Sequence, residues 1–78
     1  MGYLGPVRAR KVRDLLRLLR ERGCTEVRQR GSHRIWRCGA CQTTIPGRDG
    51  ETVPTGTLRS IQRHLAPCLG QKWLEEDA

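Results

Sequence analysis

Aromatic residues are scarce in this 78-residue chain, which contains two tryptophans, one tyrosine and no phenylalanine. Hydrophobic residues make up only 36% of the sequence, so we expect one small core built mainly from Leu, Val and Ile. No apolar run approaches the roughly 20 residues that cross a bilayer. The first ten residues also lack the apolar segment of a secretory signal peptide. These absences predict a cytoplasmic protein with no membrane partner.

Several catalytic motifs are missing as well. The sequence has no Gly-rich phosphate-binding loop, no His-Glu-x-x-His zinc motif and no nucleophile elbow. Asp14 and Asp49 are isolated along the chain, so no pair of carboxylates indicates a metal-dependent nuclease. We therefore expect no cofactor and no catalytic metal.

Acidic residues are few, and their distribution is uneven. Fifteen Lys and Arg face eight Asp and Glu, which gives a net charge of +7. The first 48 residues contain twelve cationic and three acidic residues, whereas the last 30 contain three and five. Such a basic body favours a polyanionic partner such as RNA, because each neutralised phosphate releases condensed counterions. The alternative is a solvated, arginine-rich surface.

Hydrophobic periodicity predicts two helices. The first extends from Arg8 to Arg22 and ends at Gly23, with an apolar face formed by Val12, Leu15, Leu16 and Leu19. The second begins with Thr55 as N-cap and ends near Leu65, because Pro67 is expected to stop it; its apolar positions are Leu58, Ile61 and Leu65. We expect the tail after Pro67 to form a short acidic helix that docks Trp73 and Leu74, or to fray.

Between the helices, the pattern indicates three short strands at 24–29, 33–38 and 42–45. The dipeptides Gly31-Ser32 and Gly39-Ala40 are typical of two-residue hairpin turns, and Pro46 ends the third strand. The order α-β-β-β-α predicts an α+β fold, in which a three-stranded antiparallel sheet carries the helices on one face.

Four cysteines allow more than one interpretation. Without a signal peptide, reduced thiols are the main expectation. Cys38 and Cys41 would face each other across a hairpin turn, which also allows a disulfide between them. A zinc site is the third possibility, with Cys24 and Cys68 completing the ligand set, or with His33 or His64 as substitutes.

Three segments together resemble one protein family. They are "VRQRGSH" across the first turn, "TTIP" in the third strand and "GTLRSI" in the second helix, all downstream of an amphipathic helix that ends in glycine. In this order they resemble the HicA toxins of bacterial toxin–antitoxin systems, from about residue 7 to residue 65. The resemblance predicts a HicA-like domain over residues 1–66, with an acidic extension at 67–78.

The resemblance implies a fold like that of the double-stranded RNA-binding domain, an mRNA-cleaving activity and an antitoxin partner of the HicB type. The functional histidine of the family corresponds to His33, which would be catalytic. Family members often carry a second histidine after the proline of the third strand, whereas Gly47-Arg48 follows Pro46 here. That departure leaves a non-catalytic RNA-binding module as one alternative, and the four cysteines leave a zinc-stabilised nucleic-acid-binding domain as another.

The residues around His33 suit phosphate chemistry. An imidazole titrates near neutral pH, so His33 can act as a general base on a ribose 2′-hydroxyl without a metal ion. Gly31 would let RNA approach closely, and Ser32 would donate a hydrogen bond to a phosphate oxygen. Arginines in this segment offer guanidinium groups to phosphates, and the candidates are Arg30, Arg34 and Arg37. Without the family motif, His33 would be interpreted first as a partly exposed strand residue. We expect His64 to be a surface residue of the second helix.

Overall fold

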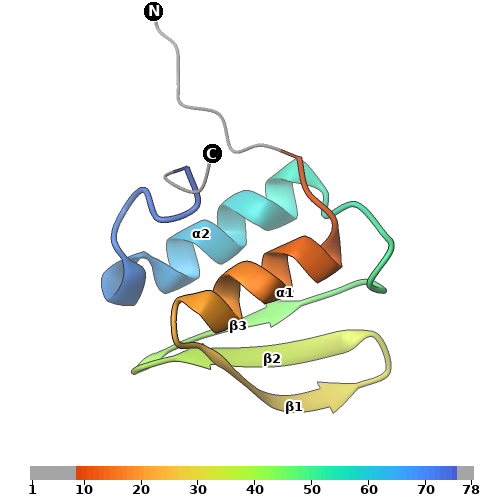
Figure 1. Cartoon of the computed structure of the whole chain (residues 1–78), viewed down its shortest axis with the longest axis horizontal. Helices are drawn as coiled ribbons and strands as arrows, with labels where there is room; N and C mark the ends of the chain where they lie inside the picture. The colour runs from red at the N-terminus through yellow and green to blue at the C-terminus, as the bar shows by residue number, and fades with distance from the viewer. Residues whose placement is uncertain (1–8, 76–78) are drawn as a thin grey trace, which may run out of the picture.

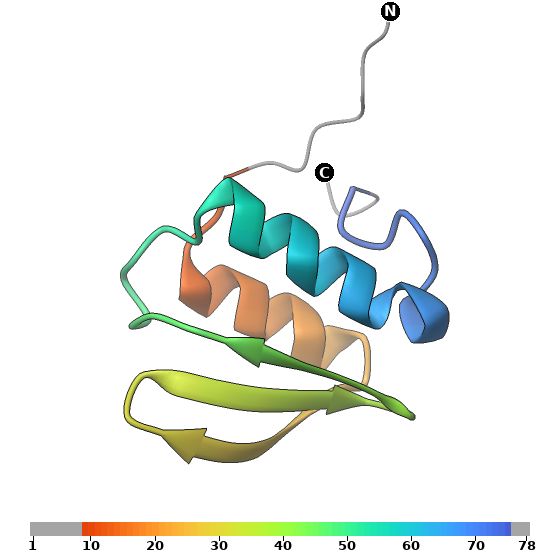
Figure 2. The same cartoon turned by 180° about the vertical axis from the view of Figure 1, so that it is seen from behind.

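The computed structural model describes residues 9–75 and has the predicted order of elements (Figure 1). Helix α1 spans Val12–Glu21, the strands are β1 at Thr25–Arg30, β2 at His33–Cys38 and β3 at Cys41–Ile45, and helix α2 spans Thr55–Leu69. The sheet is antiparallel throughout, with the order β1-β2-β3. Both helices lie on one side of the sheet (Figures 1 and 2), as the sequence predicts.

Helix α1 ends as expected, but it begins later. Gly23 has a φ of 85°, and its N–H donates to the carbonyl of Arg20, while the N–H of Cys24 donates to the carbonyl of Leu19. This pair of bonds satisfies the last carbonyls of the helix in a Schellman motif. The predicted start at Arg8 lies outside the described residues. Arg10 and Lys11 are not helical, because they pair with the segment before α2 instead.

The loop between β3 and α2 supplies the N-terminal cap of α1. The carbonyls of Glu51 and Asp49 accept hydrogen bonds from the N–H groups of Val12 and Arg13, at 2.9 and 3.1 Å. The N–H of Val53 donates to the carbonyl of Arg10 at 2.9 Å, so the loop and the approach to α1 form a short antiparallel contact. These bonds satisfy orphan N–H groups of the helix, and they fix the loop in place.

Two predictions about α2 are wrong. Pro54, not Thr55, is the N-cap residue, and the helix continues through Pro67 to Leu69. Pro67 lies in the last turn, where its missing N–H deprives only one carbonyl of a partner. Gly70 ends the helix with a φ of 104°, and its N–H donates a hydrogen bond to the carbonyl of Ala66.

The segment after α2 docks on the core, but it does so as turns and not as a helix up to residue 75. Trp73 and Leu74 are both fully buried, and the indole Nε1–H of Trp73 donates to the carbonyl of Gln62 at 3.1 Å. The side chain of Gln62 donates in turn to the carbonyl of Gln71 and the carboxylate of Glu75. The boundary predicted after residue 66 therefore falls inside α2, and residues 67–75 belong to the same packed body.

All four cysteines form disulfide bonds, which corrects the expectation of reduced thiols and of a Cys38–Cys41 bond. Cys24 is bonded to Cys38, and Cys41 is bonded to Cys68. Cys38 and Cys41 are opposite each other in the hairpin register, as predicted. The partners come from elsewhere, because the residue before β1 lies beside Cys38 and the last turn of α2 lies beside Cys41, with Cα–Cα distances of 4.3 and 6.1 Å.

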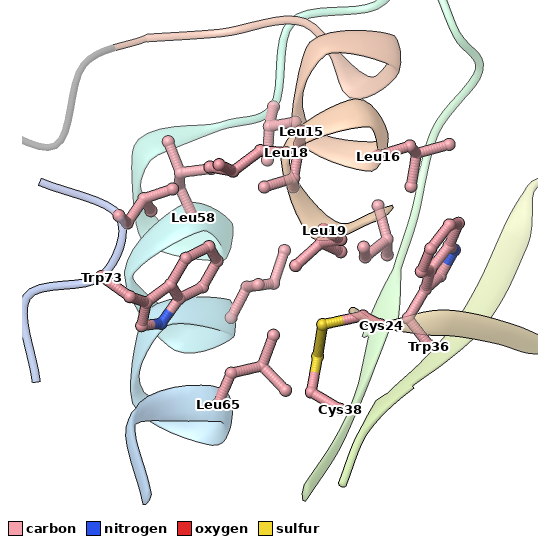
Figure 3. Packing of buried hydrophobic residues seen from close by; sticks show 14 of the residues in the cluster. Leu15, Leu16, Leu18, Leu19, Cys24, Trp36, Cys38, Leu58, Leu65 and Trp73 are labelled. Atoms are coloured by element: carbon pink, nitrogen blue, oxygen red, sulfur yellow. A yellow bond between two sulfur atoms is a disulfide. The ribbon is translucent and has the colours of Figure 1, made fainter. Parts of the chain in front are cut away.

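The core combines leucines of both helices with the inner side of the sheet. Figure 3 shows Trp36, Trp73 and the Cys24–Cys38 bond among these leucines. Trp36 is 2% exposed, and the guanidinium of Arg20 lies 5.5 Å from the centre of its ring, within the range of a cation–π contact. Leu, Ile and Val side chains supply most of this core, and the two tryptophans and the Cys24–Cys38 bond complete it.

Reduction of the disulfides is expected to destabilise the domain strongly. The bonds close loops with sequence separations of 14 and 27, and a bond that closes a loop of about 15 residues stabilises by about 3 kcal/mol. We expect the midpoint of thermal unfolding to fall by more than about 10 °C in a phosphine reductant, since about 1 kcal/mol corresponds to 4–8 °C in a domain of this size. The double variants Cys24→Ser/Cys38→Ser and Cys41→Ser/Cys68→Ser remove one disulfide each, so they measure the contribution of each bond separately. The buried 24/38 pair should cost more, because both serines would be buried. Equal midpoints with and without reductant would contradict the paired cysteines.

Trp73→Ala tests whether the C-terminal segment is part of the fold. Loss of a fully buried tryptophan should lower the free energy of unfolding by about 3–5 kcal/mol in a urea titration. Lys72→Ala is the matched control, because its side chain is exposed and such changes usually stay within about 0.5 kcal/mol. Identical midpoints for the two variants would show that the segment does not dock.

Candidate nucleic-acid interface

The side chains of β2 alternate between two environments. Trp36 and Cys38 are buried under the helices, at 2% and 3% exposure. His33 and Arg37 are out of phase with them and are exposed, and Ile35 is half-buried. Successive side chains of a strand point to opposite faces, so these three residues lie on the side of the sheet opposite to the helices. We call this side the open face (Figure 2).

The strand register shows what surrounds His33 on the open face. Arg30 of β1 is directly opposite His33, and Arg28 is directly opposite Ile35. Residues opposite each other in an antiparallel pair share a face and lie close together. Arg37 lies on the same face, four residues along β2, which corresponds to roughly 13 Å. The open face therefore carries His33 and three arginines, and none of these arginines forms an ion pair with a residue in the described range 9–75.

A β-bulge in β1 determines which arginines join this face. The register shifts between Glu26 and Arg28, so that Val27 is an extra residue in the strand. Without the shift, the alternation that begins at Thr25 would turn Arg28 and Arg30 toward the helices. With the shift, both arginines lie beside His33. The sequence analysis did not identify Arg28, because no residue in this stretch signals a bulge.

The turn before His33 holds its predicted neighbours. Gly31 has a φ of 58° and Ser32 does not have a positive φ, which is the pattern of a two-residue type II′ turn. The side-chain amide of Gln29 donates to the carbonyl of Gly31 at 2.9 Å and braces the turn. Ser32 is half-buried, and His33 follows it as the first, exposed residue of β2.

Arg34 lies apart from the other predicted contact residues. It belongs to the covered face of β2, and its side chain is only 17% exposed. Its Nη2 forms an ion pair with Oδ1 of Asp49, at 2.8 Å, in the loop that caps α1. The structure thus gathers Arg30, Gly31, Ser32 and His33 at one turn, with Arg37 farther along the same face and Arg34 on the other face.

The second histidine is remote from this site. His64 is exposed on α2, as predicted, and its Nδ1 is hydrogen-bonded to Oγ1 of Thr43 at 2.9 Å. Thr43 is directly opposite the buried Trp36, so this contact lies on the covered side of the sheet. Among residues 9–75, no group of three or more His, Cys, Asp or Glu is arranged to hold a metal ion. The zinc alternative would require both disulfides to open first.

Comparison with protein families identifies the family to which this chain belongs. The family model described as the HicA toxin of bacterial toxin–antitoxin systems matches residues 12–66. The chain belongs to the HicA toxin family, as its resemblance predicted, and such a toxin implies an antitoxin partner. Comparisons with curated proteins and with solved structures give no significant match. No helix within residues 9–75 is long and apolar enough to cross a membrane.

Proposed function

We propose that this toxin is a metal-independent endoribonuclease that cleaves mRNA in the cytoplasm, with His33 as the catalytic base. The observation that carries the proposal is the position of His33, exposed at the end of the open face and directly opposite Arg30. A base and a cation side by side are what attack on a phosphodiester needs, because one must accept a proton while the other stabilises developing negative charge.

In the proposed step, the imidazole of His33 takes the proton of a ribose 2′-hydroxyl. The 2′-oxygen forms a bond to the adjacent phosphorus, and the bond from phosphorus to the 5′-oxygen of the next nucleotide breaks. The products are a 2′,3′-cyclic phosphate and a 5′-hydroxyl, and the departing oxygen takes a proton from the imidazolium or from water. Arg30, directly opposite His33 in the strand register, would neutralise the charge that grows on the phosphoryl oxygens.

The other open-face arginines extend a path for the RNA backbone. Arg28 lies two residue pairs from His33, opposite Ile35, and Arg37 lies at the far end of the face. Neither guanidinium is neutralised by a carboxylate in the described chain, so phosphates would not have to displace an ion pair. Binding should therefore weaken steeply as salt concentration rises.

The same face suits the antitoxin partner, which we infer to be of the HicB type. A surface whose three arginines form no ion pair within residues 9–75 attracts an acidic protein surface as well as RNA. An antitoxin that covers His33 and Arg30 would block substrate and base together. This arrangement explains how a cell tolerates a toxin whose catalytic histidine is exposed.

One observation favours a second function, that of an RNA-binding module without cleavage. On the open face within residues 9–75, no further Asp, Glu, His or Lys accompanies His33, and His64 lies on the opposite side. A single acid–base group must then serve both proton transfers, and turnover should be slow. The experiment below separates slow cleavage from none.

Replacement of His33 by alanine should abolish cleavage while RNA binding persists. We expect a loss of about 10²–10⁴-fold in single-turnover rate on a labelled single-stranded RNA in EDTA, as is typical when a general base is removed. Affinity for the RNA should change little, since the open-face arginines remain. End analysis of the wild-type products should give a 2′,3′-cyclic phosphate and a 5′-hydroxyl.

His64→Gln is the matched control, because it changes a histidine that is exposed on α2 and distant from the open face. It should cleave at the wild-type rate. A 5′-phosphate product, a strict need for Mg²⁺ or equal cleavage by His33→Ala would refute the proposed chemistry. Binding without cleavage by the wild-type protein would assign the chain to the RNA-binding class.

A further inference from the structure

Beside the turn that carries His33, the surface is hollowed on the side opposite to the open face. The hollow has a volume of about 450 Å³, which is in the range of small-molecule sites. One wall comes from the β1–β2 hairpin through Gln29, Gly31, Ser32 and Arg34, and the other from the loop at 47–49. Figures 1 and 2 show this turn and this loop at the same end of the molecule. His33 does not line the hollow, although both of its chain neighbours do.

The Arg34–Asp49 ion pair joins the two walls. The two side chains contribute unequally to the surface, since Arg34 is 17% exposed and Asp49 is 62% exposed. The Nε of Arg34 is buried and has no hydrogen-bond partner within the described structure, while Nη2 is paired with Oδ1 of Asp49. Because Arg34 lines the hollow and keeps part of its side chain exposed, its accessible guanidinium N–H groups lie next to a carboxylate that can accept further hydrogen bonds.

The charge of the pair determines which part of a nucleotide fits. Asp49 already neutralises Arg34, since its carboxylate lies 2.8 Å from the guanidinium. The same exposed carboxylate would repel a phosphate that approached Arg34. A neutral nucleobase has no such conflict, because its edge offers both acceptors and donors. The exposed Arg48 at the rim remains available for a phosphate.

Guanine has the edge that matches this pair best. Its O6 accepts a hydrogen bond, and its N1–H and N2–H₂ donate two adjacent ones. A guanidinium can donate to O6 while the carboxylate accepts from N1 and N2, and the ion pair need not separate. The other three bases do not place two donor nitrogens beside an acceptor in this way.

We propose that this hollow is a base-binding subsite that selects guanine next to the scissile phosphate. Its role in cleavage rests on the proposed ribonuclease function. Ser32 and Arg34 line the hollow and flank His33 in the chain, so the hollow lies next to the residue proposed as the base. An RNA strand that crosses the turn would present a phosphate to His33 on one side and a base to Arg34 on the other. Single-stranded RNA is commonly read in this way, with bases splayed away from the backbone.

Mononucleotide binding tests the subsite without any cleavage. The His33→Ala protein is titrated with the 5′-monophosphates of guanosine, adenosine, cytidine and uridine, and with inorganic phosphate, while backbone amide shifts are followed by NMR. We expect shifts at residues 29–34 and 47–49, and an affinity for the guanosine nucleotide about tenfold or more above the others. Equal affinity for all four nucleotides, phosphate binding as tight as that of the guanosine nucleotide, or shifts confined elsewhere would overturn the proposal.

Asp49→Asn and Asp14→Asn form a matched pair of variants in the same background. Each removes one carboxylate from an arginine ion pair, since Asp14 pairs with Arg17 at 2.9 Å on α1. Asp49→Asn should reduce the guanine preference to within about threefold, and Asp14→Asn should leave it unchanged. Unchanged preference in Asp49→Asn would refute the assigned contact. Should Asp49→Asn fail to fold, Asp49→Glu keeps the carboxylate and should retain a guanine preference, and its loss would count against the subsite.

Cleavage mapping then connects the subsite to the proposed function. On a long unstructured RNA, wild-type cuts should cluster next to guanosines, and Asp49→Asn should cut without that bias. Cuts with no guanosine bias would refute the role of the hollow in cleavage. If no RNA is cut, the proposed function fails, while the mononucleotide titration still decides whether the subsite exists.

Discussion

The pairing of β2 with both of its neighbours is the constraint on which the rest of this molecule depends. β2 is the central strand of the three, and its alternation sends Trp36 into the core and His33 to the opposite face. Two-residue turns with Gly31 and Gly39 at positive φ fix its register at both ends. A shift of one residue would exchange the two faces, so the same hydrogen bonds that build the core also expose the histidine.

The second constraint is the loop between β3 and α2, which is held by the start of α1. Its carbonyls cap the first N–H groups of that helix, and this attachment brings Asp49 to Arg34 on the hairpin. An ion pair alone would hold an exposed carboxylate only weakly, since surface ion pairs contribute little to the free energy of folding. Here the backbone positions the carboxylate, and the hollow beside the His33 turn exists because the loop held by α1 meets the β1–β2 hairpin.

The disulfides complement a core that is poor in aromatic residues. Cys24 and Cys38 connect the end of α1 to β2 inside the core, and Cys41 and Cys68 connect the hairpin to the last turn of α2. The second bond also helps to explain why α2 continues past Pro67, because the turn that contains the proline is held against the sheet. The docked Trp73 closes the other side of α2, so the acidic C-terminal segment is structural up to residue 75.

The sequence by itself determined the order of the elements, the end of α1 at Gly23, the two hairpin turns and the family, because each depends on residues that are neighbours in the chain. Hydrophobic periodicity and glycine positions are local signals, and they survive without knowledge of the fold. The tertiary structure alone decided the cysteine pairing, the continuation of α2, the bulge that turns Arg28 and Arg30 toward His33, and the ion pair between Arg34 and Asp49 on the covered side of the sheet. The cysteine pairing, the helix continuation and the ion pair depend on which distant segments meet, and the bulge depends on one extra residue that changes the alternation of the strand. The spacing of nearby residues encodes neither of these causes.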